Sequence, residues 1–366
     1  EFKKIGLQYF DGLKSYRQST AIYKPKIISV KGNIDGNEID DKNVMVIGSA
    51  ESITLNNNSG YEIATIPAGK DLRSEVSKIT GSDKNYFVIV DTSYSARFIR
   101  FKKSNPAIFE NKTSVFLLSA SIPLKYDLQI KQEVSKLPLA NVVGILPGNS
   151  KKDEYVIFSG HYDHLGIGKP DAKGDSIYNG ANDDAAGTTA VIMLSKYFSQ
   201  LKNNERTLIF VAFTGEEIGG YGSQYFSKQL NPDKVVAMFN IEMIGTESKW
   251  GTNSAYITGY ERSDFGKILQ ANLTNSKFHF EPDPYPKQNL FYRSDNATLA
   301  ALGVPAHTIS TSKMEEPPNN EPNYHKQSDE IGTLDMNNMA EIIKAIAISS
   351  KTIVNGKDAP ARVEKK

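Results

Sequence analysis

Three short apolar runs in the middle of the chain, each ending in acidic or histidine residues, form the clearest pattern in the sequence. They read EYVIFSGHYDH, TLIFVAFTGEE and VVAMFNIEMIG. A short, near-continuous apolar run is typical of a strand that is buried on both faces of a parallel sheet. Apolar residues at helical spacing follow the first run at 188–201 and the second at 221–230. This alternation of strand and helix predicts an α/β fold with helices on both faces of the sheet.

The pattern of strands and helices extends on both sides of these runs. Residues 140–160 contain two apolar segments around a Pro-Gly turn, which predicts a hairpin of two strands. Beyond residue 250 there are two further strand patterns and three helix patterns. The predicted strands are 254–260 and 304–312, and the predicted helices are 263–275, 293–303 and 336–356.

The segment 42–125 differs in texture from the rest of the chain. Short β-type runs, ARFIRF among them, are separated by Asn, Gly, Ser and Lys clusters, and KDLRSEVSKI is one short helical pattern. We expect a small β-rich insert that acts as a lid or spacer. The chain then divides into the start of the main domain, with a helix remnant and an edge strand (1–41), the insert (42–125) and the rest of the main domain (126–366).

Composition narrows the choice of partners. The 366 residues include 43 Lys and Arg against 42 Asp and Glu, a net charge of +1, and no basic block is interleaved with aromatics. We therefore expect neither a nucleic-acid partner nor an anionic membrane. No apolar run approaches the roughly 20 residues that span a bilayer. The absence of cysteine excludes disulfides, thiolate nucleophiles and Cys-ligated zinc.

The N-terminus gives an expectation about location. The sequence starts at Glu1 rather than Met, and EFKKIGL is typical of the last turns of a helix that ends at Gly6. We expect a signal peptide and part of a first helix to precede this sequence, and hence a secreted or periplasmic protein. No pattern in the sequence indicates an oligomeric state.

The polar residues after the three apolar runs are the candidate functional residues. His161 and Asp163 follow the first run, Glu216 and Glu217 the second, and Glu242 the third. In open α/β sheets, ligands bind just outside the carboxyl ends of the strands, so these side chains should converge there. Imidazole and carboxylate groups are ligands for zinc. The convergence predicts a metal site.

Two further residues complete the candidate ligands. Asp183 lies at the start of the helix pattern, and His325 lies in YHKQSDE. A catalytic zinc site uses about three protein ligands for each ion, so five ligands suffice for two ions if one carboxylate bridges them. Two-metal hydrolytic sites hold their ions about 3.5–4 Å apart. Asp183, on a tight loop, is suited to the bridge, and we expect two Zn²⁺ ions per chain.

Each histidine ligand also needs a hydrogen-bond acceptor that orients its ring. Asp163, two residues after His161, and Asp329, four residues after His325, are placed to accept the second ring N–H. Glu216 is adjacent to the candidate ligand Glu217. Since two adjacent residues beyond a strand end can point in different directions, we expect Glu216 to act as the general base.

Three histidines remain outside this set of ligands. His307 lies in an apolar strand pattern and is expected to be a core residue, and His279 lies in a polar stretch and is expected at the surface. His164 lies beside the site. We expect it to support the site from an outer position or from the loop.

Six motifs resemble, in order, those of the co-catalytic zinc aminopeptidase family, which also includes glutamate carboxypeptidase and glutaminyl cyclase. They are SGHYDH, NGANDDAAG, AFTGEEIGGYGS, NIEMIG, RSDNATLAALGVPA and YHKQSDE. The resemblance covers residues 130–355 closely and 1–20 loosely. It implies a three-layer α/β sandwich with a mixed, mostly parallel central sheet. Many members insert a protease-associated domain where this chain has its β-rich insert.

The resemblance also implies how the candidate residues divide between two ions. It assigns His161 and Glu242 to one zinc and Glu217 and His325 to the other. It makes Asp183 the bridge between the ions and Glu216 the base. Asp183 rather than Asp184 is the bridge because it lies four residues before Gly187, and the family often has a cis peptide bond directly after it. Tyr324 matches a tyrosine that contacts the tetrahedral intermediate in some relatives.

Two residues depart from the family pattern. Glu242 stands where the family usually has Asp, and Asn296 stands where it usually has the His of RSDH. The longer side chain of Glu242 is expected to shift the metal or change the metal preference. We nevertheless expect Glu242 to ligate, since a glutamate accommodates its extra methylene at a rotamer cost of about 0.5–1.5 kcal/mol.

The function that these residues imply is that of a di-zinc aminopeptidase, which hydrolyses the first peptide bond of peptides with a free N-terminus. Glutaminyl cyclases tend to have Trp beside the metal-binding His, where this chain has Tyr324. A carboxypeptidase needs a cationic group for the substrate carboxylate. Arg293 is the candidate, and Asp295 is a second candidate substrate contact. A non-catalytic homologue remains a further alternative, although all five ligands and the base are present.

Overall fold

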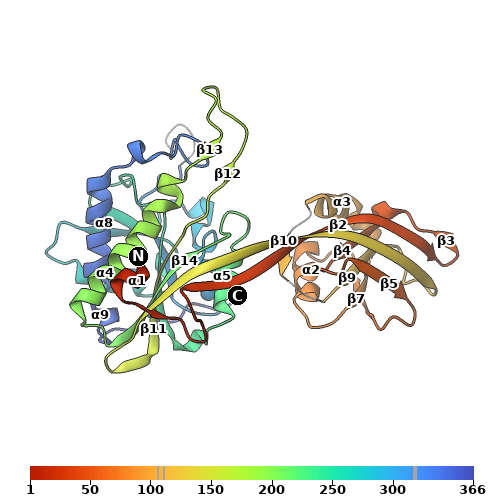
Figure 1. Cartoon of the computed structure of the whole chain (residues 1–366), viewed down its shortest axis with the longest axis horizontal. Coiled ribbons are helices and arrows are strands. Elements are labelled where there is room, and N and C mark those ends of the chain that lie inside the picture. Colours follow the sequence, from red (N-terminus) through yellow and green to blue (C-terminus); the bar gives the residue numbers. More distant parts are fainter. Residues whose placement is uncertain (105–106, 110–111, 316–319) are drawn as a thin grey trace. The chain divides into compact units, whose positions relative to one another are not determined.

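The computed structural model describes residues 1–104, 107–109, 112–315 and 320–366. The chain forms two compact units, which are coloured along the sequence in Figure 1. The main unit comprises Glu1–Ser19 and Ala140–Lys366, and the inserted unit is Thr20–Leu139. The inserted unit is wider than the predicted insert 42–125. Its boundaries fall within two long strands, β2 (Arg17–Ile34) and β10 (Tyr126–Leu146), where the sequence shows no change of texture.

The main unit is built around one mixed sheet with the order β17-β16-β18-β15-β11-β14-β10. Parallel pairs join β11 to β14 and β15, β15 to β18, and β16 to β17, whereas β10 and β14 are antiparallel, as are β16 and β18. The predicted mixed, mostly parallel sheet is confirmed. Besides the end of β10, the strands of this unit are β1 (Gln8–Tyr9), β11 (Lys151–His161), β12 (Gly166–Ile167), β13 (Ile177–Tyr178), β14 (Arg206–Phe213), β15 (Val235–Ile241), β16 (Ser254–Ile257), β17 (His279–Pro282) and β18 (Ala306–Ser310).

Helices cover both faces of this sheet. Apolar residues of α4, α6 and α8 belong to one core cluster, and those of α5 and α7 belong to a second. The predicted three-layer sandwich is therefore confirmed. The helices are α1 (Phe2–Ile5), α4 (Ala186–Leu201), α5 (Tyr221–Ser227), α6 (Phe265–Asn272), α7 (Asn296–Ala301), α8 (Met336–Ser349) and α9 (Lys351–Val354).

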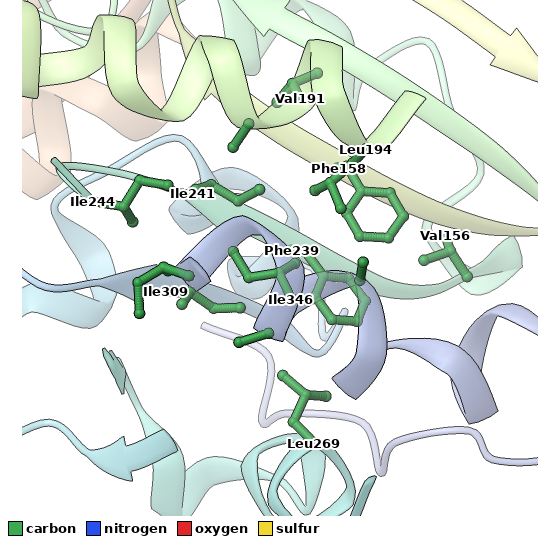
Figure 2. Close-up of a cluster of buried hydrophobic side chains, with 14 of the residues drawn as sticks. Val156, Phe158, Val191, Leu194, Phe239, Ile241, Ile244, Leu269, Ile309 and Ile346 are labelled. Carbon is green, nitrogen blue, oxygen red and sulfur yellow. The ribbon is translucent and has the colours of Figure 1, made fainter. Parts of the chain in front are cut away.

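Alternate residues of each central strand pack into opposite helix layers. Phe158 of β11 stacks on Phe239 of β15 with ring centroids 4.8 Å apart, beside Leu194 of α4 (Figure 2). The adjacent residues Ile157 and Met238 lie in the second cluster. Burial of each such side chain contributes about 1.5–3 kcal/mol. Both faces of the strands are therefore apolar, which explains the continuous runs in the sequence.

The hairpin predicted at 140–160 is wrong. β14 lies between β10 and β11, antiparallel to the first and parallel to the second, so that Leu208 pairs with Leu146 on one side and Val156 on the other. The Pro-Gly turn therefore connects two strands that are separated by β14, rather than two neighbouring strands. All eight residues of β14 are buried, and a buried strand needs hydrogen-bonding neighbours at both edges.

The inserted unit has its own sheet, with the order β4-β9-β7-β6. The predicted short helix is confirmed as α2 (Leu72–Thr80), but ARFIRF is helical rather than extended and lies within α3 (Ser95–Ser104). Tyr94, Phe98 and Phe101 recur at helical spacing and pack in one core cluster, and this burial decides the conformation. The other strands of this unit are β3 (Asn37–Glu38), β4 (Val44–Ile47), β5 (Ser52–Asn56), β6 (Glu62–Ile66), β7 (Tyr86–Val90), β8 (Ile108–Phe109) and β9 (Ser114–Leu118).

Candidate metal centre

The sheet of the main unit brings three strand ends to one edge. β11 lies between β14 and β15 and is parallel to both, and its register on β15 places His161, its last residue, level with Glu242. Glu216 and Glu217 follow the end of β14 after Thr-Gly. The residues that the sequence predicted to converge at the carboxyl ends of the strands are thus brought to the same edge.

Asp183 is presented by the loop before α4, and its neighbour Asp184 ties that loop to the strand ends. The buried Asp184 carboxylate accepts hydrogen bonds from the main-chain N–H groups of His161 (3.1 Å), Gly187 (3.0 Å) and Met243 (3.0 Å). The peptide bond between Asp183 and Asp184 is cis, as the resemblance implied. Since the backbone satisfies Asp184, Asp183 is the carboxylate that faces the strand ends.

The predicted role of Asp329 is wrong. In the part of the chain that the structure describes, its carboxylate holds the loop of Asp183 rather than the ring of His325. It accepts hydrogen bonds from the N–H groups of Asn182 (2.8 Å) and Asp183 (3.0 Å), and its side chain is buried. Hydrogen bonds to a carboxylate are among the stronger ones in proteins. Asp329 therefore positions Asp183 across 146 residues of sequence.

Asp163 orients His161 with a different atom from the one expected. The Nδ1 atom of His161 donates to the main-chain carbonyl of Asp163 at 2.9 Å, whereas the Asp163 carboxylate lies 3.9 Å away. With Nδ1 protonated, the Nε2 atom of the neutral ring carries a free lone pair. His161 is therefore in the tautomer that can bind a metal through Nε2.

One group of possible ligands consists of His161, Asp183 and Glu242. Each offers one atom, and the three atoms lie within 4.8 Å of one another. His161 Nε2 lies 3.2 Å from Asp183 Oδ1 but has no hydrogen-bond partner. The structure thus brings Glu242 into this group despite its extra methylene.

A second group consists of His164, Asp183 and Glu217, again with ligand atoms within 4.8 Å of one another. The Nε2 atom of His325 lies 3.3 Å from Asp183 Oδ2 and 3.3 Å from Glu217 Oε2. All five predicted ligands are therefore brought together. Asp183 belongs to both groups, which is the position a bridging carboxylate would occupy.

His164 lies beside these ligands, as the sequence predicted. Its Nδ1 atom is 2.6 Å from Glu217 Oε1, a contact with a ligand that is compatible with the expected supporting role. The signal in the sequence was the spacing of HYDH, which puts His164 three residues after His161. Spacing alone does not fix the direction of a side chain in a loop, and the fold of the loop decides it.

The spacing and burial of these atoms fit zinc. At Zn–N and Zn–O distances of about 2.0–2.2 Å, two ligands of a tetrahedral ion lie about 3.3–3.6 Å apart. The contacts of His161 and His325 with the carboxylates, at 3.2 and 3.3 Å, are close to that value. Buried polar atoms normally have partners, yet the Nε2 atoms of His161 and His164 make no hydrogen bond in the described part of the chain. A bound cation would supply that partner.

Comparison with known proteins agrees with this geometry. A model of Peptidase family M28 matches residues 141–349. The chain belongs to peptidase family M28. A probable zinc metalloprotease of Pyrenophora teres f. teres is 32% identical over 124 residues, which are 33% of this chain and 26% of that protein. The chain therefore matches about a quarter of that relative's length.

Solved structures show the same fold. An aminopeptidase from Aneurinibacillus sp. strain AM-1 matches with a TM-score of 0.51 at 17% identity, covering 100% of this chain and 87% of that one. A zinc aminopeptidase from Bacillus subtilis matches with a TM-score of 0.54 at 13% identity, covering 100% and 89%. In the described part of this M28 chain, no helix has the length and apolar character needed to cross a membrane.

The electrostatics of the M28 site reflect its buried charges. Burial raises the pKa of Glu216 to about 10, and the nearby carboxylates of Glu242 and Asp295 add to this rise. Burial alone would lower the pKa of His161, but the contact with Asp183 and the surrounding carboxylates raise it well above its usual value. Positive charge is therefore strongly favoured at the centre of this group of carboxylates.

A cavity of about 300 Å³ opens beside the ligands, and Glu216 is on its wall. Tyr324 also lines it and stacks on His325 with ring centroids 3.9 Å apart. Burial raises the pKa of Tyr324 to about 12, so its hydroxyl stays protonated at neutral pH and can donate a hydrogen bond. Arg293 lines the same cavity.

Asp295 and Asn296 lie behind the cavity rather than in it. Asp295 is 1% exposed and is not a lining residue, so the predicted substrate contact of Asp295 is wrong. The Asn296 amide donates to the carbonyls of Phe291 (2.8 Å) and Ala306 (3.1 Å), and the residue is buried. Asn296 is thus a structural residue at the start of α7.

The two remaining histidines lie where the sequence predicted. His307 is buried, donates from Nδ1 to the carbonyl of Thr258 (2.8 Å) and accepts at Nε2 from Ser263 (2.8 Å), so it is a satisfied core residue. Burial lowers its pKa to about 4. His279 is exposed in β17.

Proposed function

We propose that this chain is a di-zinc aminopeptidase that hydrolyses the first peptide bond of peptides with a free N-terminus. The observation that carries the proposal is the pair of ligand groups that share Asp183 beside a cavity with Glu216 on its wall. Two neighbours that share the fold over the whole chain, one an aminopeptidase and the other a zinc aminopeptidase, support it.

The proposal assigns three ligands to each ion, as a catalytic zinc site requires. His161, Glu242 and Asp183 would hold one ion, and Glu217, His325 and Asp183 the other. Such ions polarise a carbonyl group and lower the pKa of water from 15.7 to about 7. The carboxylates of Asp184 and Asp329, which hold the backbone of this region, keep the ligands in place.

Glu216 is the proposed general base. In this reaction the attacking water gives a proton to the Glu216 carboxylate as its oxygen bonds to the carbonyl carbon of the first residue. Glu216 then returns that proton to the leaving amine as the C–N bond breaks. A carboxylate on the cavity wall, adjacent to the ligand Glu217, is suited to reach both atoms. The Tyr324 hydroxyl is available to donate a hydrogen bond to the carbonyl oxygen as negative charge develops there.

The cavity wall also bears on which end of a peptide binds. Four carboxylates line it, those of Asp183, Glu216, Glu217 and Glu242. Three of them are proposed zinc ligands, so in the loaded site the two ions compensate their charge, and Glu216 is the one carboxylate among the lining residues that is not assigned to a metal. The hydroxyl and thioether groups of Thr258, Ser310 and Met314 are available to the substrate side chain. The choice between an N-terminal and a C-terminal residue therefore rests on the assays below.

The proposal is tested by assaying the purified chain on substrates that differ only in the bond offered. Aminoacyl p-nitroanilides should be cleaved, and their N-acetylated counterparts should not. A chelator should abolish the activity and added zinc restore it, with two zinc ions per chain by elemental analysis. Cyclisation of N-terminal Gln peptides without hydrolysis of any aminoacyl p-nitroanilide would refute an aminopeptidase.

A carboxypeptidase is the second candidate because Arg293 lines the cavity. A guanidinium group is the usual partner of a substrate carboxylate. The same assays with peptides ending in Glu separate the two functions, since Arg293→Ala would raise the KM of a carboxypeptidase by two orders of magnitude or more. For an aminopeptidase, the same substitution should change KM less than ten-fold.

A further inference from the structure

His164 is a buried imidazole beside two of the proposed ligands. Its side chain is 7% exposed, and its Nδ1 atom contacts Glu217 Oε1, whereas its Nε2 atom has no hydrogen-bond partner within the described part of the chain. Buried polar atoms in native proteins normally have a partner. His164, Asp183 and Glu217 offer ligand atoms within 4.8 Å of one another, so the ring is placed where a cation could be held between it and the two carboxylates.

The ring faces two carboxylates. Its Nδ1 atom lies 2.6 Å from Glu217 Oε1 and 3.9 Å from Asp183 Oδ2. Two ligands of one tetrahedral zinc lie about 3.3–3.6 Å apart, so the contact with Glu217 would lengthen by about 0.7 Å when an ion enters between the two atoms. The ring of His325 lies near the ring of His164, with ring centroids 5.8 Å apart and planes at 66°. His164 and His325 thus approach the same pair of carboxylates.

The loop that presents Asp183 also makes room for this ring. Gly180 has a φ of +63°, and a Cβ atom there would lie 2.3 Å from the Asp183 carbonyl oxygen, 2.6 Å from Cγ of His164 and 2.8 Å from Cβ of His164. Real Cβ contacts are not that short. A larger residue at position 180 would therefore strain the Asp183 loop and crowd the His164 ring.

We propose that His164 is a direct ligand of the second metal ion, in addition to Asp183, Glu217 and His325. This inference rests on the proposed two-metal site and extends it. The second ion then has four protein ligands, the number in closed structural zinc sites, whereas the first ion keeps three, the number in catalytic sites. The buried His164 holds the second ion from the protein side, and His325, whose side chain is 38% exposed, holds it from the solvent side.

Zinc X-ray absorption of the wild-type protein tests the ligand set without any substitution. With two ions bound, the scattering from outer imidazole atoms should correspond to three imidazoles per two zinc ions. Two imidazoles per two ions would overturn the role of His164 and leave the proposed function intact. A wild-type chain that does not bind two zinc ions would refute the proposed function itself.

Metal competition provides the second test. Zinc affinity is measured against a chelator of known affinity for the wild type, His164→Ala and the control His279→Ala, whose exposed histidine is remote from the ligand groups. Loss of an outer partner weakens metal binding by about 10- to 100-fold. We expect His164→Ala to weaken one of the two ions by more than 100-fold and His279→Ala to weaken neither. A loss of 100-fold or less would overturn direct ligation. If His164→Ala does not fold, as judged by circular dichroism, the wild-type absorption spectrum decides.

Discussion

Glu216→Gln replaces the proposed base with an amide of nearly the same size. Glu216 belongs to neither ligand group among the described residues, so both ions should remain bound. The fold should also tolerate the change. Burial raises the pKa of Glu216 to about 10 in the metal-free protein. The Glu216 carboxyl group is therefore neutral there at pH 7, and the neutral amide of Gln resembles it.

The expected loss is confined to turnover. General base catalysis contributes about 10²- to 10⁴-fold, which at about 1.36 kcal/mol for each factor of ten corresponds to about 2.7–5.4 kcal/mol of barrier. Because Gln cannot take a proton from the attacking water, kcat should fall by that factor. KM should change little, since no ligand and no other cavity residue is removed.

The assay measures kcat and KM on an aminoacyl p-nitroanilide, together with zinc content and the thermal midpoint. Glu217→Gln is the matched control, because the same chemical change is made one residue away at a ligand. The control should lose metal from one site, whereas Glu216→Gln should not. A kcat for Glu216→Gln within ten-fold of wild type, with two ions bound, would contradict the assignment of the base.

Three further predictions concern residues whose roles the structure separates. Asp183→Ala should lose both ions because the carboxylate is shared, whereas Asp184→Ala should lower the thermal midpoint with a smaller loss of zinc; equal zinc content in wild type and Asp183→Ala would rule out the bridge. Glu242→Ala should reduce the zinc content from two ions to one, and Glu242→Asp should keep measurable activity with a changed KM or metal affinity; one ion in both wild type and Glu242→Ala would show that Glu242 does not ligate. His307 has a folded pKa of about 4, below the unfolded value of about 6.5. Its contribution to the stability of the fold is therefore present above pH 6.5 and is lost as the pH falls toward 4. That loss amounts to about 3 kcal/mol of the free energy of unfolding. The free energy of unfolding of the metal-stripped protein, measured at pH 7 and 4.5, should depend less on pH in His307→Gln than in wild type. Parallel pH profiles of the two proteins would contradict this.

Much of the site follows from the sequence because it depends on strand ends. The runs ending at His161, Phe213 and Ile241 are apolar on both faces, and buried parallel strands align their carboxyl ends at one edge. Residues that follow those ends within four positions, such as Glu217 and Glu242, are therefore brought to one edge by any α/β arrangement that keeps the three strands adjacent. Local patterns also predicted α4 and the core position of His307.

Strand neighbours were not determined by the sequence alone. The turn at Pro147 and Gly148 has residues that are typical of a hairpin. The two strands that this turn connects, β10 and β11, nevertheless have β14 between them. Which strands pair depends on the burial of whole faces, and that is a property of the assembled sheet. In the same way, ARFIRF has both strand and helix character, and packing of Phe98 in the core selects the helix.

Side chains in loops depend even more on the tertiary structure. Asp329 lies four residues from His325 in the sequence but binds the N–H groups of Asn182 and Asp183, and Asp295 lies behind the cavity rather than in it. His164 faces Glu217, and Gly180 leaves space for its ring and for the Asp183 carbonyl group. The sequence determined which chemical groups reach the edge of the sheet, since strand periodicity is local. Only the tertiary structure decided which loop side chains face the ligands, because each loop is held by hydrogen bonds to segments that are distant in the sequence.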